Sequence, residues 1–121
     1  MAKVLVIDDS RTSRKILKNI LEELGHTVIG EAADGEEGYQ LYQVLQPELT
    51  TLDITMPRMD GIEALQLIKE VDKEAKVIMI TAAGQKDKMV RSVKYGASDF
   101  ICKPIDRDAV EEIVNRVLGV E

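Results

Sequence analysis

The sequence VLVIDD at residues 4–9 places a short, mostly β-branched apolar run directly before two aspartates. Such a run is typical of a buried strand. Similar runs recur at residues 27–29, 49–54, 77–80 and 100–102. In three of these cases a polar residue stands at or just after the run, namely Asp53, Thr81 and Lys103. The pattern predicts five strands, four of which end in a functional group.

The segments between these runs change to a helical period. Four of them carry apolar or small residues at i, i+3, i+4 and i+7, starting at Leu17, Gly38, Ala64 and Val110. This spacing places the residues on one face of a helix. Residues 85–95 predict a weaker helix, because few of their side chains are apolar. Five strands alternating with five helices indicate a doubly wound α/β domain with a parallel sheet.

Turn and capping residues stand at the junctions between these segments. Asp34-Gly35 and Asp60-Gly61 come just before helical segments, and Asp106 comes before the last one. Aspartate caps a helix because its side chain accepts hydrogen bonds from the first turn. We therefore expect Gly61 to have a structural role at a helix start.

Length, charge and cysteine content limit the class of protein. The 121 residues suit one domain spanning residues 1–121. A net charge of −6 and few aromatic residues argue against direct nucleic-acid binding. The apolar runs are too short to span a membrane, and Asp8 and Asp9 interrupt the first before a signal peptide can form. The single cysteine, Cys102, is expected to be a small buried residue in a cytoplasmic protein.

The polar residues that follow the strands predict a site for phosphoryl chemistry. Parallel strands end at one edge of the sheet, so the carboxylates of Asp8, Asp9 and Asp53 should converge there. Three carboxylates repel one another unless a cation neutralises them, and Mg²⁺ prefers such oxygen ligands. Lys103 and Thr81 would add a positive charge and a hydroxyl donor. This set can bind a phosphoryl group and stabilise charge on its oxygens.

Asp53 is the candidate nucleophile of this site. Aspartate can accept phosphate covalently, and Asp53 lies on a different strand from the Asp8-Asp9 pair, which it can therefore face. A phosphohydrolase of the haloacid-dehalogenase type uses similar groups. Its nucleophile, however, sits on the first strand with an acid two residues later, where this sequence has Ser10. The chain also lacks room for a cap domain, so we reject that class.

Four segments carry a resemblance to a known family: VIDDS at 6–10, LDITMPRMDG at 52–61, ITAA at 80–83 and DFICKP at 99–104. In this order and spacing they resemble the response-regulator receiver family over essentially the whole chain. Within that family the sequence looks most like the stand-alone CheY-type chemotaxis regulators. The resemblance implies a flavodoxin-like sheet with strand order 2-1-3-4-5.

The resemblance also implies how phosphate and metal are held. Asp53 would be the phosphoacceptor. Asp9 and Asp53 would ligate Mg²⁺ directly, together with the backbone carbonyl of Thr55. Asp8 would act mainly through metal-bound water. The domain would catalyse only its own phosphorylation and dephosphorylation, so it would not be an enzyme in the usual sense.

A second group of residues is implied to respond to phosphorylation. Lys103 would pair with one phosphoryl oxygen, and Thr81 would donate a hydrogen bond to another. Phe100 matches the switch aromatic that rotates inward as the threonine moves. The bond between Lys103 and Pro104 is expected to be cis, as in the family.

The implied partners follow from this chemistry. A sensor histidine kinase would donate the phosphoryl group, and a protein such as a flagellar switch component would bind the phosphorylated form. A phosphatase is a further possible partner, and we expect a cytoplasmic monomer that binds neither nucleic acid nor membrane. Two alternatives stay open: a phosphorelay intermediate that passes the phosphoryl group on, and a pseudo-receiver that binds partners without phosphorylation.

Overall fold

The computed structural model describes residues 1–120 and alternates strands with helices along the chain. The strands are β1 (Lys3–Ile7), β2 (Thr27–Ala32), β3 (Leu49–Asp53), β4 (Val77–Thr81) and β5 (Asp99–Cys102). The helices are α1 (Arg11–Glu23), α2 (Gly35–Leu45), α3 (Gly61–Val71), α4 (Lys86–Lys94) and α5 (Arg107–Leu118). The predicted alternation of five strands with five helices is confirmed.

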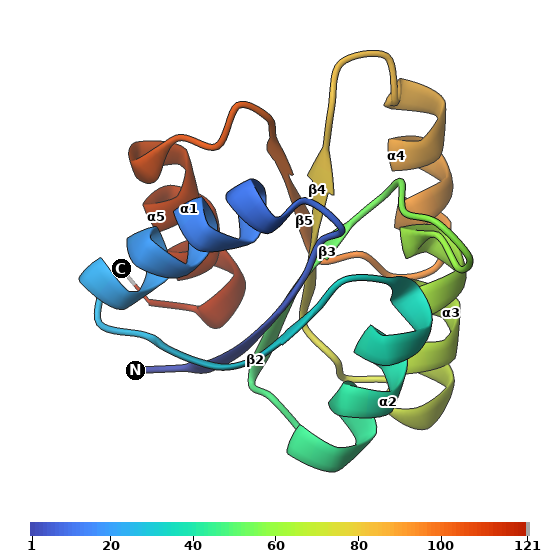
Figure 1. Cartoon of the computed structure of the whole chain (residues 1–121), viewed down its shortest axis with the longest axis horizontal. Helices are drawn as coiled ribbons and strands as arrows, with labels where there is room; N and C mark the ends of the chain where they lie inside the picture. Colours follow the sequence, from blue (N-terminus) through green and yellow to red (C-terminus); the bar gives the residue numbers. More distant parts are fainter. Residues whose placement is uncertain (121) are drawn as a thin grey trace.

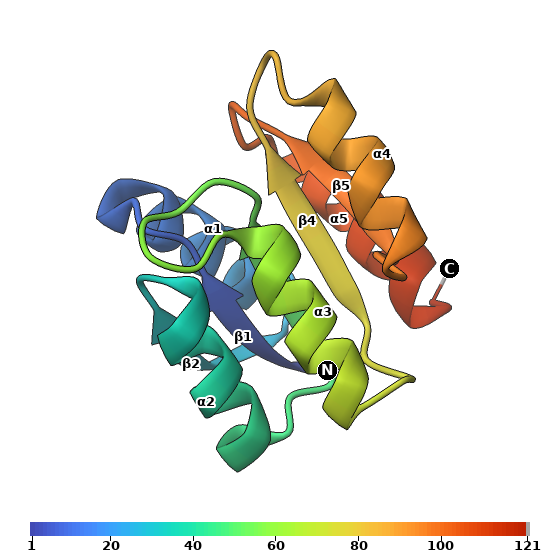
Figure 2. The ribbon, with the colours of Figure 1, turned by 90° about the vertical axis from the view of Figure 1, so that its right-hand side faces the viewer.

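All five strands are parallel and form one sheet in the order β2-β1-β3-β4-β5. This confirms the order that the family resemblance implied. Helices α1 and α5 cover one face of the sheet, and α2, α3 and α4 cover the other (Figures 1 and 2). From β1 the chain continues to β2, which lies on one side of β1. The later strands β3, β4 and β5 follow one another on the other side of β1. The boundary between β1 and β3 is therefore the switch point at which ligands bind in such sheets.

Successive side chains of each strand point to opposite faces, so the sheet is buried on both sides. In β1, Leu5 and Ile7 belong to the core layer toward α2 and α3, while Val4 and Val6 belong to the layer toward α1 and α5. All four side chains are fully buried. The strand interiors thus hold apolar residues, and the polar residues that follow them are left at the edge of the sheet.

Side chains of Ser10, Asp34, Asp60 and Asp106 cap the first turns of α1, α2, α3 and α5. Gln85, which precedes α4, makes no such bond. Helix α4 is also the shortest of these helices, with nine residues, and Ser92 is its buried member. The expectation of a weak helix in this region is confirmed. No helix within residues 1–120 combines the length and hydropathy that crossing a membrane requires.

Gly61 lets the start of α3 approach β3 closely. Its amide donates to the carbonyl of Ile54 at 2.7 Å. A Cβ atom on residue 61 would lie 2.1 Å from the carbonyl oxygen of Asp53. Only glycine fits this contact without moving the backbone next to Asp53.

The prediction that Cys102 is buried is wrong, because the residue is exposed. Cys102 is the last residue of β5, and β5 is an edge strand of the sheet. Its strand neighbour Ile101 is fully buried. The core side chains therefore end one residue before the position that the apolar run suggested.

Candidate functional site

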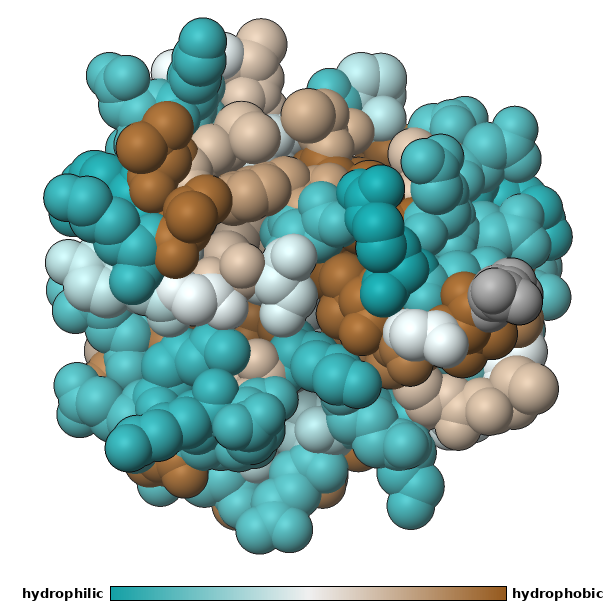
Figure 3. Space-filling model, turned by 180° about the vertical axis from the view of Figure 1, so that it is seen from behind, coloured by the Kyte–Doolittle hydropathy of each residue, from teal (hydrophilic) through white to brown (hydrophobic). Residues whose placement is uncertain are grey.

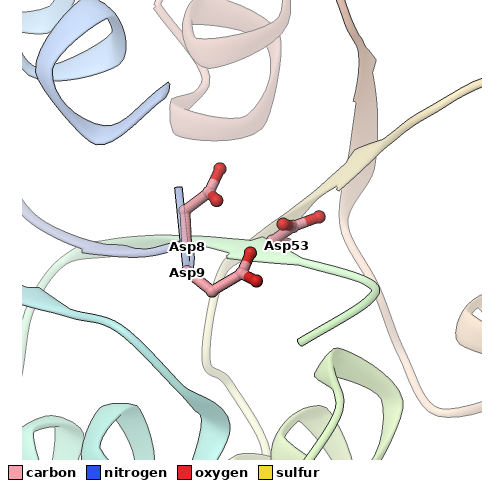
Figure 4. A group of neighbouring side chains, drawn as sticks. All are labelled: Asp8, Asp9 and Asp53. Carbon is pink, nitrogen blue, oxygen red and sulfur yellow. The ribbon is translucent and has the colours of Figure 1, made fainter. Parts of the chain in front are cut away.

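Three carboxylates meet at the carboxyl edge of β1 and β3. Ile7 pairs with Leu52, so the residues that follow them, Asp8 and Asp53, emerge side by side. Asp9 comes next along the chain, and all three side chains converge (Figure 4). One carboxylate oxygen from each residue lies within 4.8 Å of the others. The structure therefore brings together the three acidic residues that the sequence pattern selected.

The three carboxylates differ in their exposure to solvent. Asp8 is 2% exposed and Asp53 is 5% exposed, whereas Asp9 is exposed. The Ser10 amide donates to Asp8 Oδ1 at 2.8 Å, which holds this carboxylate in place. Burial of neighbouring negative charges is unfavourable unless a cation compensates them.

Lys103 provides one positive charge beside this cluster. Its Nζ lies 3.5 Å from Asp8 Oδ2 and 3.5 Å from Asp53 Oδ2. The backbone amide of Lys103 donates to the carbonyl of Thr81 at 2.7 Å, and the following bond to Pro104 is cis. One lysine against three carboxylates leaves an excess of two negative charges. A divalent cation can balance that excess.

Burial, followed by the adjacent Asp8 carboxylate, raises the pKa of the Asp53 carboxyl to about 7. Lys103 acts in the opposite direction, and the Asp9 charge raises the pKa further. The ionised form of Asp53 is thus unfavourable, because the neighbouring carboxylates repel its charge. A bound cation would favour the ionised carboxylate, which is the form that can act as a nucleophile.

Thr81 and Phe100 lie on the neighbouring strands. The Thr81 side chain is buried, and its hydroxyl donates to Cys102 Sγ at 3.5 Å. Phe100 is half-buried and packs against the core layer under α2 and α3. The structure thus places Thr81 at the edge that carries Asp53, with its hydroxyl directed toward β5.

The sequence-family model described as the response regulator receiver domain matches residues 4–115 of this chain. The chain belongs to the response regulator receiver family. Protein CcdB of Bacillus subtilis is 47% identical over 119 residues, which are 98% of this chain and 99% of the relative. The chemotaxis protein CheY of Thermotoga maritima is 42% identical, over 95% of this chain and 96% of the relative.

A solved structure agrees with this receiver fold. CheY in the CheX-CheY-BeF3-Mg²⁺ complex from Borrelia burgdorferi superposes with a TM-score of 0.90 at 43% identity. The match covers 96% of this chain and 88% of the other. A receiver of the CheY type is a phosphoacceptor signalling domain rather than a conventional enzyme. Its acidic cluster is consistent with a receiver Mg²⁺ site, because the donors are hard carboxylate oxygens with uncompensated charge.

Several residues that support the receiver site were missed in the sequence. Arg14 Nη1 donates to the carbonyl of Asp8 at 2.6 Å, and Arg14 also pairs with Glu31 on β2. Arg58 has a positive φ of 65° and pairs with Asp34 at 2.8 Å, which joins the loops that precede α2 and α3. No local pattern marks these residues, because the ion pairs Arg14–Glu31 and Arg58–Asp34 join positions 17 and 24 residues apart. The contact between Arg14 and the Asp8 carbonyl spans six residues and depends on how the start of α1 lies beside the end of β1. The aspartates were found because Asp53 ends one strand and the Asp8-Asp9 pair follows another.

Proposed function

We propose that residues 1–121 form one receiver domain in which Asp53 accepts a phosphoryl group from a sensor histidine kinase. The observation that carries this proposal is the buried Asp53 carboxylate, which lies beside Asp8 with Lys103 Nζ 3.5 Å away. The proposal assigns Asp53 rather than Asp8 or Asp9 as the acceptor. The Asp8 carboxylate is engaged by the Ser10 amide, and Asp9 is the exposed member of the cluster.

In the transfer, an oxygen of the Asp53 carboxylate attacks phosphorus, and the phosphorus–nitrogen bond of the donor phosphohistidine breaks. The imidazole leaves and takes up a proton from solvent. Lys103 pairs with a phosphoryl oxygen and stabilises its charge. Asp8, Asp9, Asp53 and the carbonyl of Thr55 would hold Mg²⁺, which neutralises charge on the phosphoryl oxygens.

The phosphoryl group then changes the surface that partners contact. Thr81 leaves Cys102 and donates to a phosphoryl oxygen, and Phe100 moves inward into the space that the threonine vacates. The affected face is formed by α4, β5 and α5. Val90 and Val93 on α4 are 58% and 59% exposed, and apolar side chains appear among polar ones on the α4 side of the molecule, at the upper left of Figure 3. Such a mixed surface suits a protein partner.

The biological role that the relatives support is chemotaxis. CheY proteins of several organisms align with more than nine-tenths of this chain at 41–44% identity. The target would then be a protein such as a flagellar switch component, and a phosphatase would be a further partner. We place the chain in the cytoplasm as a monomer. A phosphorelay intermediate uses the same Asp53 chemistry and differs in passing the phosphoryl group to a second histidine.

Intact-mass spectrometry after incubation with acetyl phosphate and Mg²⁺ tests the phosphoacceptor. The wild type should gain one phosphoryl group, with acetate as the leaving group, and chelation of Mg²⁺ should prevent the gain. Asp53→Asn should not be labelled. Asp108→Asn is the matched control, because Asp108 is an exposed aspartate in the first turn of α5 and its loss should leave labelling intact.

Two further variants separate the assigned roles. Asp9→Ala should lose most Mg²⁺-dependent labelling. Lys103→Ala should still accept the phosphoryl group but fail to switch its partner binding, so full activation of this variant would contradict the role of Lys103. A wild type that is not labelled while a known receiver is labelled in parallel would favour the pseudo-receiver.

A further inference from the structure

Gln85 links the two loops that border Asp53. Its Oε1 accepts a hydrogen bond from the Ala82 amide at 2.6 Å, and its Nε2 donates to Thr55 Oγ1 at 2.5 Å. Asp53 pairs with Ile80 where the two strands end, and Thr55 and Ala82 follow two residues later in the loops after β3 and β4. Gln85 therefore ties the loop after β3 to the loop after β4 at the edge of the sheet that carries the Asp53 carboxylate.

The same side chain determines how α4 begins. A serine or aspartate caps the first turn of α1, α2, α3 and α5, but Gln85 directs its side chain to the neighbouring loops instead. Lys88 in the first turn of α4 adds a second contact, from its Nζ to Thr55 Oγ1 at 3.4 Å. Ser92 is the buried residue of α4, so little core packing holds the helix in place. Thr55, two residues after Asp53, is thus an anchor for the start of α4.

We propose that Gln85 is a positioning residue that acts as a latch, holding the Ala82 amide and the start of α4 until an anion on Asp53 replaces it. This inference rests on the proposed function of Asp53 as phosphoacceptor. The Ala82 amide follows Thr81 directly, so it is available to an oxygen of a group bonded to Asp53 once the glutamine leaves. When Gln85 leaves, its bond to Thr55 is also lost, and the first turn of α4 is released.

The direction of this exchange follows from charge. Hydrogen bonds to an ionised oxygen are roughly twice as strong as bonds between neutral groups. A phosphoryl oxygen therefore displaces the neutral amide oxygen of Gln85 from the Ala82 amide. Release of α4 alters the surface that carries the exposed side chains of Val90 and Val93. The latch thus connects the charge on Asp53 to the face on which a partner would dock.

The test compares Gln85→Met with the wild type in two measurements. Methionine keeps the length of the side chain but removes both hydrogen bonds. The first measurement is the affinity for beryllofluoride with Mg²⁺, the phosphoryl analogue present with the Borrelia relative. Because Gln85 no longer competes for the Ala82 amide, the variant should bind at least about fivefold more tightly, which corresponds to the net contribution of the bond to Ala82 alone.

The second measurement is amide hydrogen exchange at Ala82 without beryllofluoride. Exchange should be faster in Gln85→Met than in the wild type, since the amide has lost its acceptor. Gln43→Met is the matched control. Gln43 is an exposed glutamine on α2 whose side chain contacts its own helix, and neither measurement should change in that variant. Gln85→Ala should repeat both effects without a long side chain.

The outcomes separate the latch from the function on which it rests. Beryllofluoride binding by Gln85→Met that equals or falls below that of the wild type would overturn the latch, and so would unchanged exchange at Ala82. A wild type that binds no beryllofluoride in the presence of Mg²⁺ would refute the proposed phosphoacceptor function itself.

Discussion

Replacing Asp53 with asparagine is expected to stabilise the metal-free protein at neutral pH. Burial and the neighbouring Asp8 charge raise the pKa of Asp53 from 3.8 to about 7. Below about pH 4 the carboxyl is protonated in both the folded and the unfolded chain. Between about pH 4 and 7 the unfolded chain ionises first, so the free energy of unfolding falls as the pH rises. Asparagine carries no charge and avoids this loss.

The pKa values set an upper limit for the effect. A pKa raised from 3.8 to about 7 corresponds to about 4 kcal/mol of lost stability once the pH exceeds both values. Asp53→Asn should therefore be more stable than the wild type by up to about 4 kcal/mol near pH 8, and the difference should fall to about 2 kcal/mol near pH 5.

Urea unfolding in the presence of a chelator, near pH 8 and near pH 5, measures both differences. Asp108→Asn removes the same formal charge from an exposed position and should change stability little. Excess Mg²⁺ should stabilise the wild type and leave Asp53→Asn nearly unchanged, because the variant lacks one of the three carboxylates. If Asp53→Asn is no more stable than the wild type near pH 8 without metal, the argument from repulsion is wrong.

Three further predictions concern other parts of the fold. The buried hydroxyl of Thr51 has no hydrogen-bond partner within residues 1–120, so Thr51→Val should raise the free energy of unfolding by about 1 kcal/mol in urea titrations. His26 Nδ1 accepts from the Ala2 amide, and burial lowers the pKa of His26, so stability should fall as the pH drops below about 6.5. Thermal melts in the Asp53→Asn background should show this loss, and His26→Leu should remove it. Gly61→Ala should weaken Mg²⁺ binding and lower the melting temperature, because its Cβ meets β3 backbone.

The fold was predictable because its signals are local. Each strand is a short apolar run, and each of the four well-marked helices shows a single apolar face. The acidic cluster was predictable for the same reason. Asp8 directly follows β1, Asp53 ends β3, and these two strands pair with each other. Only the topology was needed to bring them together, and the family resemblance supplied the strand order.

The residues that the sequence did not predict depend on contacts between distant segments. Cys102 ends an apolar run and looks buried, but its exposure depends on where the helices stop covering the sheet. Arg14 reaches Glu31 across 17 positions in the sequence, and Gln85 reaches Thr55 across 30. Side chains of this kind follow no spacing rule. Their partners are known only once the loops are placed in space.

The electrostatics of the site explain why its remaining groups are weakly held. In the proposed function, phosphorylation of Asp53 would replace one carboxylate charge with a group that carries nearly two negative charges and extends further from β3. Lys103 already lies between Asp8 and Asp53, so other groups must provide the additional donors. Thr81 donates to the sulfur of Cys102, which is a weak acceptor, and the Ala82 amide donates to a neutral side chain. Both bonds are weaker than bonds to an anion, so a phosphoryl group can replace them, which is the property that a switch requires.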